Sequence, residues 1–330
     1  MFDFSVKKFV ITAILFISWE LNAQVALPTF QGVQSVPEPP LYSFSSHTFT
    51  NCGQTGRTGP TLANCKSSYN TTWENDTDLF NVQTQGIQEW TVPQTGTYTI
   101  EARGAQGGHG GSYSGGKGAR IIGNFSLTMG TVLKILVGQQ GIGHSTSSRA
   151  GGGSGGSFVT KSPHNSNASI LVIAGGGSGS GGSNTGQDGR TQTSGGQGGG
   201  STSGAAGGTN GNGGSAATST YGNGAGGAGG FFTDGASNST WGDQKGYAYV
   251  NGGAGGTSRS GGTVGGFGCG AGTHYYNTGG GAGGGYSGGG AGRHGTAYVG
   301  GGGGSYNSGS SQSNTAGYRT GQGQVIITLN

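Results

Sequence analysis

The sequence has few charged residues, few prolines and almost no cysteine. Of its 330 residues, 8% are charged, seven are proline and three are cysteine. The net charge of +4 is too small for charge-driven disorder. Lys and Arg are scattered singly and do not form the basic stripe typical of nucleic-acid binding, so we expect no nucleic-acid partner. All prolines lie at or before Pro163, which excludes a collagen triple helix, because that structure needs proline throughout and glycine at every third position.

The N-terminal segment is typical of a secretory signal. Two lysines precede an apolar stretch over 9–19, and a small-residue cleavage pattern ends at Ala23. The stretch is shorter than the roughly 20 residues that cross a bilayer. We therefore predict a signal peptide over 1–23, a Pro-containing linker over 24–41, and a secreted extracellular product without a membrane span after cleavage.

Glycine is present in large excess, at 83 of 330 residues, against roughly 7% in ordinary proteins. Between residues 177 and 323 the only Leu, Ile or Val residues are Val250, Val264 and Val299, so no ordinary core can form there. Flexible linkers share this composition, but they lack the aromatic residues that interrupt these glycine runs. Extended glycine chains can instead pack side by side through backbone hydrogen bonds. We expect a glycine-rich insertion over 177–323 that forms a polyglycine II helix bundle.

Short β-branched and aromatic runs, separated by turn signals, predict strands elsewhere. These runs cover 87–92, 97–102, 119–127, 131–137, 157–160, 170–174 and 324–329. No helical periodicity follows the signal, so the pattern predicts an all-β fold: an antiparallel sandwich over 42–176 with a closing strand over 324–330. The Pro- and Gly-containing connection over 92–97 predicts a tight turn that pairs the strands of Trp90 and Tyr98.

The three cysteines leave their pairing open. Cys52 and Cys65 close a short loop at the start of the folded region, and Cys269 is left over. Cys269 is free, linked to another chain, or paired with one of the upstream cysteines. No pair has the C-x-x-C spacing of a redox or zinc site.

Motifs that resemble phosphate-binding, metal-binding or catalytic sites have simpler explanations. Residues 111–117 match a phosphate-binding loop as far as its lysine, but Gly118 replaces the Mg²⁺ ligand and no helix pattern follows. Glu74, Asp76 and Asp78 form a polar cluster typical of a solvated loop, and the six histidines are dispersed. We therefore predict a protein that is not an enzyme, with no catalytic, cofactor-binding or metal site.

Two other sets of residues are candidates for modification and binding. Sequons for N-glycosylation occur at Asn70, Asn75, Asn124, Asn167 and Asn238. The aromatic residues between glycine runs are candidate recognition loops, because aromatic side chains are favoured at binding surfaces. They are Phe231, Phe232, Trp241, Tyr247, Tyr249, Tyr275 and Tyr276.

Three groups of segments carry a resemblance to a known family. The first is the cysteine loop from Phe49 to Cys65; the second runs from Gly86 to Gly108; the third comprises 135–141, 171–177 and 265–268. In order and spacing they resemble the extracellular glycine-rich domain of the anaplastic lymphoma kinase and leukocyte receptor tyrosine kinase family.

The resemblance implies a jelly-roll, tumour-necrosis-factor-like β-sandwich that carries polyglycine helices. It also implies that Cys52 and Cys65 are bonded and that the domain recognises an extracellular polypeptide. The family's Cys-rich module, membrane span and kinase have no counterpart in this sequence. We therefore expect a secreted, non-catalytic recognition or adhesion module for an extracellular protein or glycan. The alternative is a structural surface, matrix or ice-facing protein that uses a flat polyglycine slab.

Overall fold

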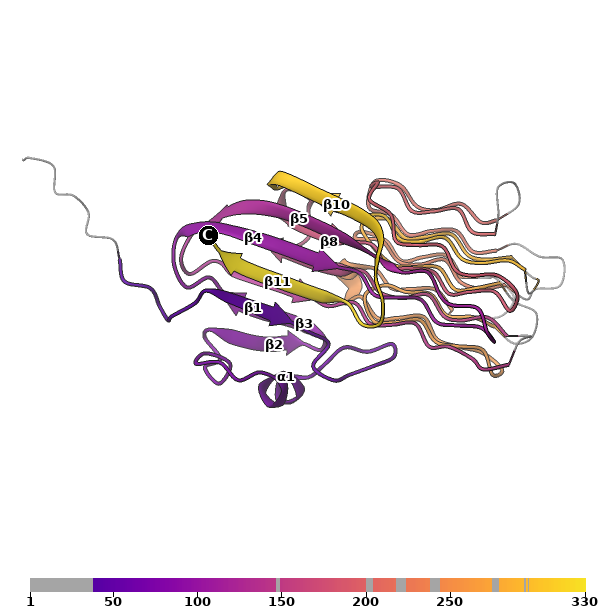
Figure 1. Cartoon of the computed structure of the whole chain (residues 1–330), viewed down its shortest axis with the longest axis horizontal. Coiled ribbons are helices and arrows are strands. Elements are labelled where there is room, and N and C mark those ends of the chain that lie inside the picture. The colour runs from indigo at the N-terminus through magenta and orange to yellow at the C-terminus, as the bar shows by residue number, and fades with distance from the viewer. Residues whose placement is uncertain are drawn as a thin grey trace, which may run out of the picture. The chain divides into compact units, whose positions relative to one another are not determined.

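The strand-rich part of the chain forms two antiparallel sheets that make a sandwich (Figure 1). Sheet A has the strand order β1-β11-β4-β5-β10, and sheet B has the order β2-β3-β6-β7-β8-β9. The computed structural model describes residues 38–146, 149–199, 204–217, 224–237, 244–274, 279–293, 295 and 297–330. The predicted signal peptide and most of the predicted linker therefore lie outside the described residues, and 39–330 form one compact unit. The antiparallel β-sandwich predicted from the sequence is confirmed, in a chain that is mostly β and also has short helical elements.

The strands and helices have the following bounds. The strands are β1 (Ser46–Phe49), β2 (Phe80–Thr84), β3 (Ile87–Thr91), β4 (Gly96–Arg103), β5 (Gly118–Leu127), β6 (Val132–Leu136), β7 (Ser157–Lys161), β8 (Ile170–Ala174), β9 (Tyr306–Asn307), β10 (Ser310–Arg319) and β11 (Gln324–Leu329). The helices are α1 (Leu62–Ser68) and two 3₁₀ turns, η1 (Asn167–Ser169) and η2 (Tyr249–Asn251).

The alternating pattern of β4 places its apolar residues in the core between the sheets. Tyr98, Ile100 and Ala102 are fully buried, whereas Thr99 and Glu101 are partly exposed. Burying a large apolar side chain contributes roughly 1.5–3 kcal/mol, so this core is the main source of stability for the sandwich. As expected, the closing strand β11 returns to sheet A, where it pairs with β1 and β4.

The prediction that a tight turn over 92–97 pairs two strands is wrong. β3 pairs with β2 and β6 in sheet B, whereas β4 pairs with β5 and β11 in sheet A. The connection therefore crosses from one sheet to the other. Trp90 and Tyr98 still meet, but across the core, with ring centroids 6.2 Å apart. Because the two strands lie in opposite sheets, both large rings face the core between the sheets.

Several elements lie outside the predicted segments, and α1 and β10 show why. The short helix α1 begins with a capping box, in which the Thr61 hydroxyl accepts from the Asn64 backbone N–H and the Asn64 side chain accepts from the Thr61 N–H. At seven residues it is too short for a visible periodicity. β10 falls inside the range predicted as glycine-rich, and its exposed polar residues do not alternate with apolar ones.

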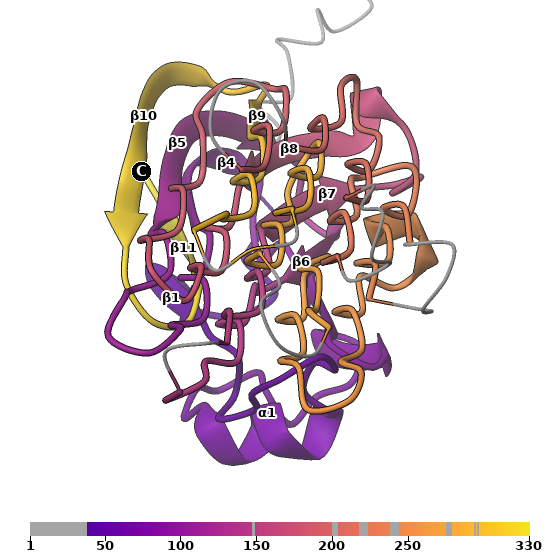
Figure 2. The same ribbon diagram turned by 90° about the vertical axis from the view of Figure 1, so that its right-hand side faces the viewer.

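The glycine segments continue from the strands and run side by side beyond them, as Figure 1 shows from the side and Figure 2 from the end. Each backbone N–H of residues 151–156 donates to a neighbouring segment. The same neighbouring segment accepts again three residues later. The pairs are Gly151 to Ser180, Gly152 to Ile142, Gly153 to Ala271, Ser154 to Gly177, Gly155 to Gln139 and Gly156 to Gly268, with N···O distances of 2.8–3.0 Å. A β-strand bonds only to two neighbours, one on each side, so this segment is not part of a sheet.

Glycine is required where these segments pack. A Cβ on Gly153 would lie 1.8 Å from the carbonyl oxygen of Ala282, and one on Gly155 would lie 1.7 Å from that of Phe267. Both contacts are with backbone atoms, which cannot turn aside as a flexible side chain does. Backbone hydrogen bonds between glycines therefore take the place of side-chain packing in this part of the chain.

Candidate functional site

The described aromatic residues of the predicted recognition loops lie mostly in a second apolar core. Phe231 and Tyr249 are buried, with exposed fractions of 0% and 3%, and their rings stack 5.0 Å apart. The ring of Phe158 in β7 also stacks on Tyr249, with ring centroids 5.1 Å apart. The prediction that Phe231 and Tyr249 form a recognition surface is therefore wrong: they cover the outer face of sheet B, which would otherwise expose its apolar residues.

The remaining residues of that set differ in position. Phe232 packs partly buried against Phe231, with ring centroids 4.8 Å apart. Tyr247 is half-buried and lies under the ammonium group of Lys245, 5.2 Å from the ring centroid. Three further members lie outside the described residues: Trp241, Tyr275 and Tyr276.

The hydroxyl of Tyr249 belongs to a hydrogen-bonded chain. Thr160 Oγ1 lies 2.8 Å from the Tyr249 hydroxyl and 2.9 Å from His164 Nδ1. Burial raises the pKa of Tyr249, and burial together with the nearby Lys134 ammonium group lowers the pKa of His164. A cavity of about 230 Å³ adjoins these groups. These hydrogen bonds satisfy the polar atoms at the edge of the second core. We therefore assign the hydrogen-bonded series of side chains a structural role.

The cysteine pairing is settled by the structure. Cys52 and Cys65 form a disulfide, with an S–S distance of 2.06 Å, as the family resemblance implied. Cys269 is a free thiol that is completely buried, and burial raises its pKa well above the ordinary value.

The sequons differ in accessibility. Asn70 and Asn75 are exposed in the loops after α1, and Asn167 is exposed, with its Oδ1 accepting from the Tyr286 hydroxyl at 2.9 Å. Asn124 lies half-buried on the outer face of β5, where its Oδ1 accepts from Thr99 at 2.8 Å. Asn238 lies outside the described residues.

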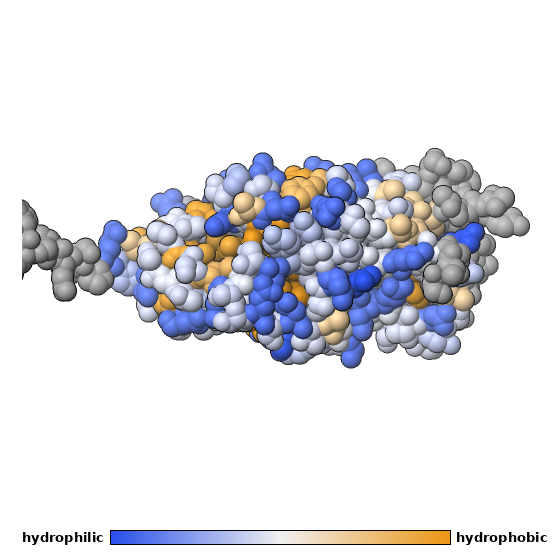
Figure 3. Space-filling view, turned by 90° about the horizontal axis from the view of Figure 1, so that it is seen from above, coloured by the Kyte–Doolittle hydropathy of each residue, from blue (hydrophilic) through white to orange (hydrophobic). Residues whose placement is uncertain are grey.

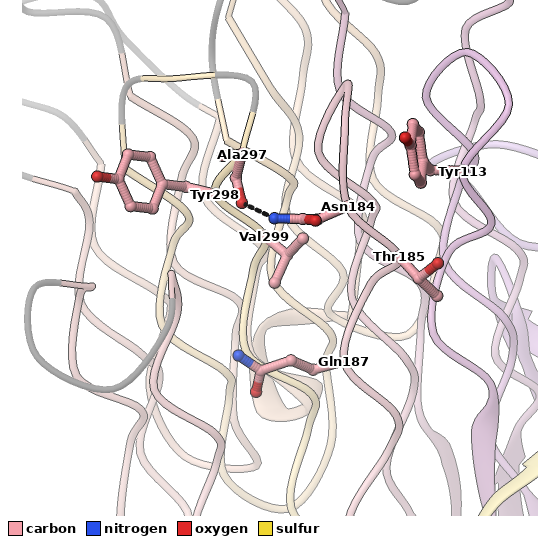
Figure 4. A pocket seen from close by; sticks show the side chains of 7 residues that line it. All are labelled: Tyr113, Asn184, Thr185, Gln187, Ala297, Tyr298 and Val299. Carbon is pink, nitrogen blue, oxygen red and sulfur yellow. Dashed lines mark hydrogen bonds between the residues drawn. The ribbon is translucent and has the colours of Figure 1, made fainter.

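An open cleft of about 680 Å³ lies in the glycine-rich part (Figure 4). Its side chains come from three separate segments that the packing of glycine runs brings together. They include Tyr113, Asn184, Thr185, Gln187, Tyr298 and Val299. None of the described residues that line it carries a charged side chain. On the face seen in Figure 3, strongly apolar residues are scattered along the glycine-rich part and do not form one broad patch there.

Backbone hydrogen bonds hold the segments of the cleft. Gly110 and Tyr113 exchange two backbone hydrogen bonds of 3.0 and 3.1 Å, which close a tight turn that presents the Tyr113 ring with 41% of its surface exposed. The Gln187 N–H donates to the Ser178 hydroxyl at 2.8 Å, and the Ser178 N–H donates to the Gln187 carbonyl at 2.9 Å. The Tyr298 carbonyl accepts from Gly280 at 3.0 Å. The cleft is thus built on fixed backbone.

Sequence reasoning did not find this cleft. Tyr113 lies within the 111–117 motif, which we considered only as a phosphate loop, and Asn184, Gln187 and Tyr298 stand out in no pattern. The available signal is weak: each is a polar or aromatic residue that interrupts a glycine run. Among the described residues, no group of three or more His, Cys, Asp or Glu side chains is placed to hold a metal ion. The helices in the described part are all too short or too polar for a membrane crossing.

Comparison with known proteins supports a partial relationship. No family model matches the chain. The leukocyte tyrosine kinase receptor of Mus musculus is 38% identical over 109 residues, which cover 32% of this chain. The chain spans only about 12% of that receptor's length. With its β-sandwich and its Cys52–Cys65 disulfide, the chain is therefore similar in part to a region of a leukocyte tyrosine kinase receptor.

Proposed function

We propose that this protein is a secreted, non-catalytic recognition module that binds an extracellular protein or glycan. The open cleft carries this proposal, because its described lining exposes aromatic and amide groups and includes no His, Asp, Glu, Lys, Arg or Cys side chain. The disulfide fits an oxidising extracellular compartment. The partial similarity to a receptor region points the same way.

The scaffold for recognition is, in this proposal, a polyglycine II helix bundle within a jelly-roll, tumour-necrosis-factor-like architecture. The three-residue repeat of hydrogen-bond partners along 151–156 supports this assignment, because polyproline II-type helices have three residues per turn. Such a bundle is stiff, since nearly every packed segment is hydrogen-bonded to several others. A stiff base lets short loops present side chains in one geometry, which lowers the entropic cost of binding.

The experiment uses the full chain, expressed with its own N-terminus and purified from the medium. Surface plasmon resonance against extracellular-matrix fractions and a glycan array measures binding. Saturable binding to a component supports the proposal, and absence of binding to every fraction and glycan refutes it. Assembly into fibres, or thermal hysteresis of freezing, without such binding favours the structural alternative.

A further inference from the structure

We propose that the cleft between Tyr113, Asn184 and Tyr298 is a binding site for an uncharged, hydroxyl-rich ligand, a neutral oligosaccharide. This inference rests on the proposed recognition function and assigns it a ligand class and a place. Its volume of about 680 Å³ lies within the range of about 300–1,000 Å³ found for small-molecule sites.

The charge of the lining selects the class of ligand. In the described part of the chain, the residues that line the cleft carry no charged side chain. An anionic ligand would lose its hydration without gaining a cationic partner, and a cationic one would find no carboxylate. The cleft therefore favours a neutral ligand over sulfated or uronate-containing glycans and over charged peptides.

Two amide side chains present oriented acceptors. Asn184 Nδ2 donates to the Ala297 carbonyl at 2.7 Å, and Gln187 Nε2 donates to the Gln197 carbonyl at 2.9 Å. Each bond fixes the orientation of its amide, so the oxygens Oδ1 and Oε1 remain as acceptors. No residue in the described part of the chain donates a hydrogen bond to either oxygen. Two fixed acceptors in one cleft suit a ligand that carries several hydroxyl donors.

Tyr113 supplies a surface for stacking. Its ring is 41% exposed and stands across the cleft from Asn184, while the Tyr298 ring points away from Tyr113 (Figure 4). An exposed tyrosine combines a flat apolar face with a hydroxyl that hydrogen-bonds. Sugar rings match this combination, because they have apolar C–H faces and polar edges. Thr185, an exposed residue, also lines the cleft.

The test measures binding of neutral hexasaccharides of glucose, mannose, galactose, xylose and N-acetylglucosamine to the full chain by isothermal titration calorimetry. Heparin hexasaccharide is the charged probe. The variants are Tyr113→Ala, Tyr113→Phe and Asn184→Ala. The matched control is Tyr318→Ala, because Tyr318 is a tyrosine on β10 with a similar exposed fraction of 43% and is not part of the cleft lining.

We expect at least one neutral hexasaccharide to bind saturably. Tyr113→Ala and Asn184→Ala should each weaken binding about tenfold, whereas Tyr113→Phe should weaken it by about threefold or less, because the ring remains. Tyr318→Ala should bind as the parent does. Unchanged near-UV circular dichroism of each variant shows that its fold is retained.

Three results overturn the inference: no neutral hexasaccharide binds, heparin binds in preference, or the cleft variants bind like the parent. If matrix proteins bind the parent chain while no neutral hexasaccharide does, the recognition function stands and the cleft assignment fails. If neither proteins nor glycans bind the parent chain, both proposals fail.

Discussion

Replacement of Gly153 by alanine tests whether glycine holds the bundle together through backbone contact. The new Cβ would lie 1.8 Å from the Ala282 carbonyl oxygen and 2.4 Å from its carbon. The 151–156 segment must therefore move away from its neighbours. That movement weakens two backbone hydrogen bonds of Gly153, its N–H to Ala271 at 2.8 Å and its carbonyl from Gly266 at 2.9 Å.

The expected cost adds these contributions. Overpacking in a tight interior costs about 1–3 kcal/mol, and each hydrogen bond contributes about 1 kcal/mol net. The free energy of unfolding should therefore fall by about 3–5 kcal/mol. At about 2 °C for each kcal/mol in a domain of this size, the melting temperature should fall by about 6–10 °C.

Urea unfolding followed by tryptophan fluorescence, together with calorimetry, measures the change. Gly130→Ala is the control, because Gly130 is an exposed turn residue with no atom within 4 Å of an added Cβ, and its φ of +80° limits the cost to the left-handed strain of about 1–2 kcal/mol. If Gly153→Ala costs no more than Gly130→Ala, the steric argument for the bundle is wrong.

Three further predictions concern the cysteines and a half-buried histidine. Replacing Cys52 and Cys65 by serine should lower the free energy of unfolding in urea by about 3 kcal/mol, because the disulfide closes a loop with a sequence separation of 13. Equal stability of the double variant and the oxidised parent would contradict this. Cys269 should not react with a thiol reagent in the native protein and should react fully in denaturant, since the thiol is buried and its raised pKa disfavours the thiolate; rapid native labelling would refute its burial. Burial lowers the pKa of His47 from 6.5 to about 4, against a smaller opposing effect of Glu74. The unfolded chain therefore takes up a proton that the folded chain rejects, and stability should fall as the pH drops from 6.5 to 4, by about 2 kcal/mol after allowance for partial exposure. His47→Phe keeps the edge-on ring contacts with Phe49, Tyr69 and Trp73 and should flatten this part of the pH profile; an unchanged slope would show that other groups cause it.

The sandwich was largely predictable because its strands obey a local rule. In β4 the alternation of Tyr98, Ile100 and Ala102 with polar residues directly indicates which side faces the core. β10 obeys no such rule, since it is an edge strand with polar residues on both faces. The sheet to which each strand belongs also escaped prediction, because the Pro- and Gly-containing connection before β4 reverses the chain in the same way whether it stays within a sheet or crosses between two.

The candidate site was not predictable for a different physical reason. Phe231 and Tyr249 have the composition of a binding loop, yet the back of sheet B offers their rings an apolar surface that no local pattern reveals. The cleft combines Tyr113 with Asn184 and Tyr298, which lie about a fifth and more than half of the chain length away from it in sequence. Only the three-dimensional packing of glycine segments defines such a neighbourhood.

An interior with room only for glycine and a few small side chains divides the sequence into positions with opposite freedom to mutate. Within packed segments such as 151–156, contacts with neighbouring carbonyls penalise any substitution by a larger residue. At the chain reversal over 110–113, the side chains of Ser112 and Tyr113 are exposed outside the packing and are free to change. Related chains should therefore keep their glycine spacing while residues equivalent to Tyr113 diverge, so that evolution can alter what this fold binds without altering how it is held together.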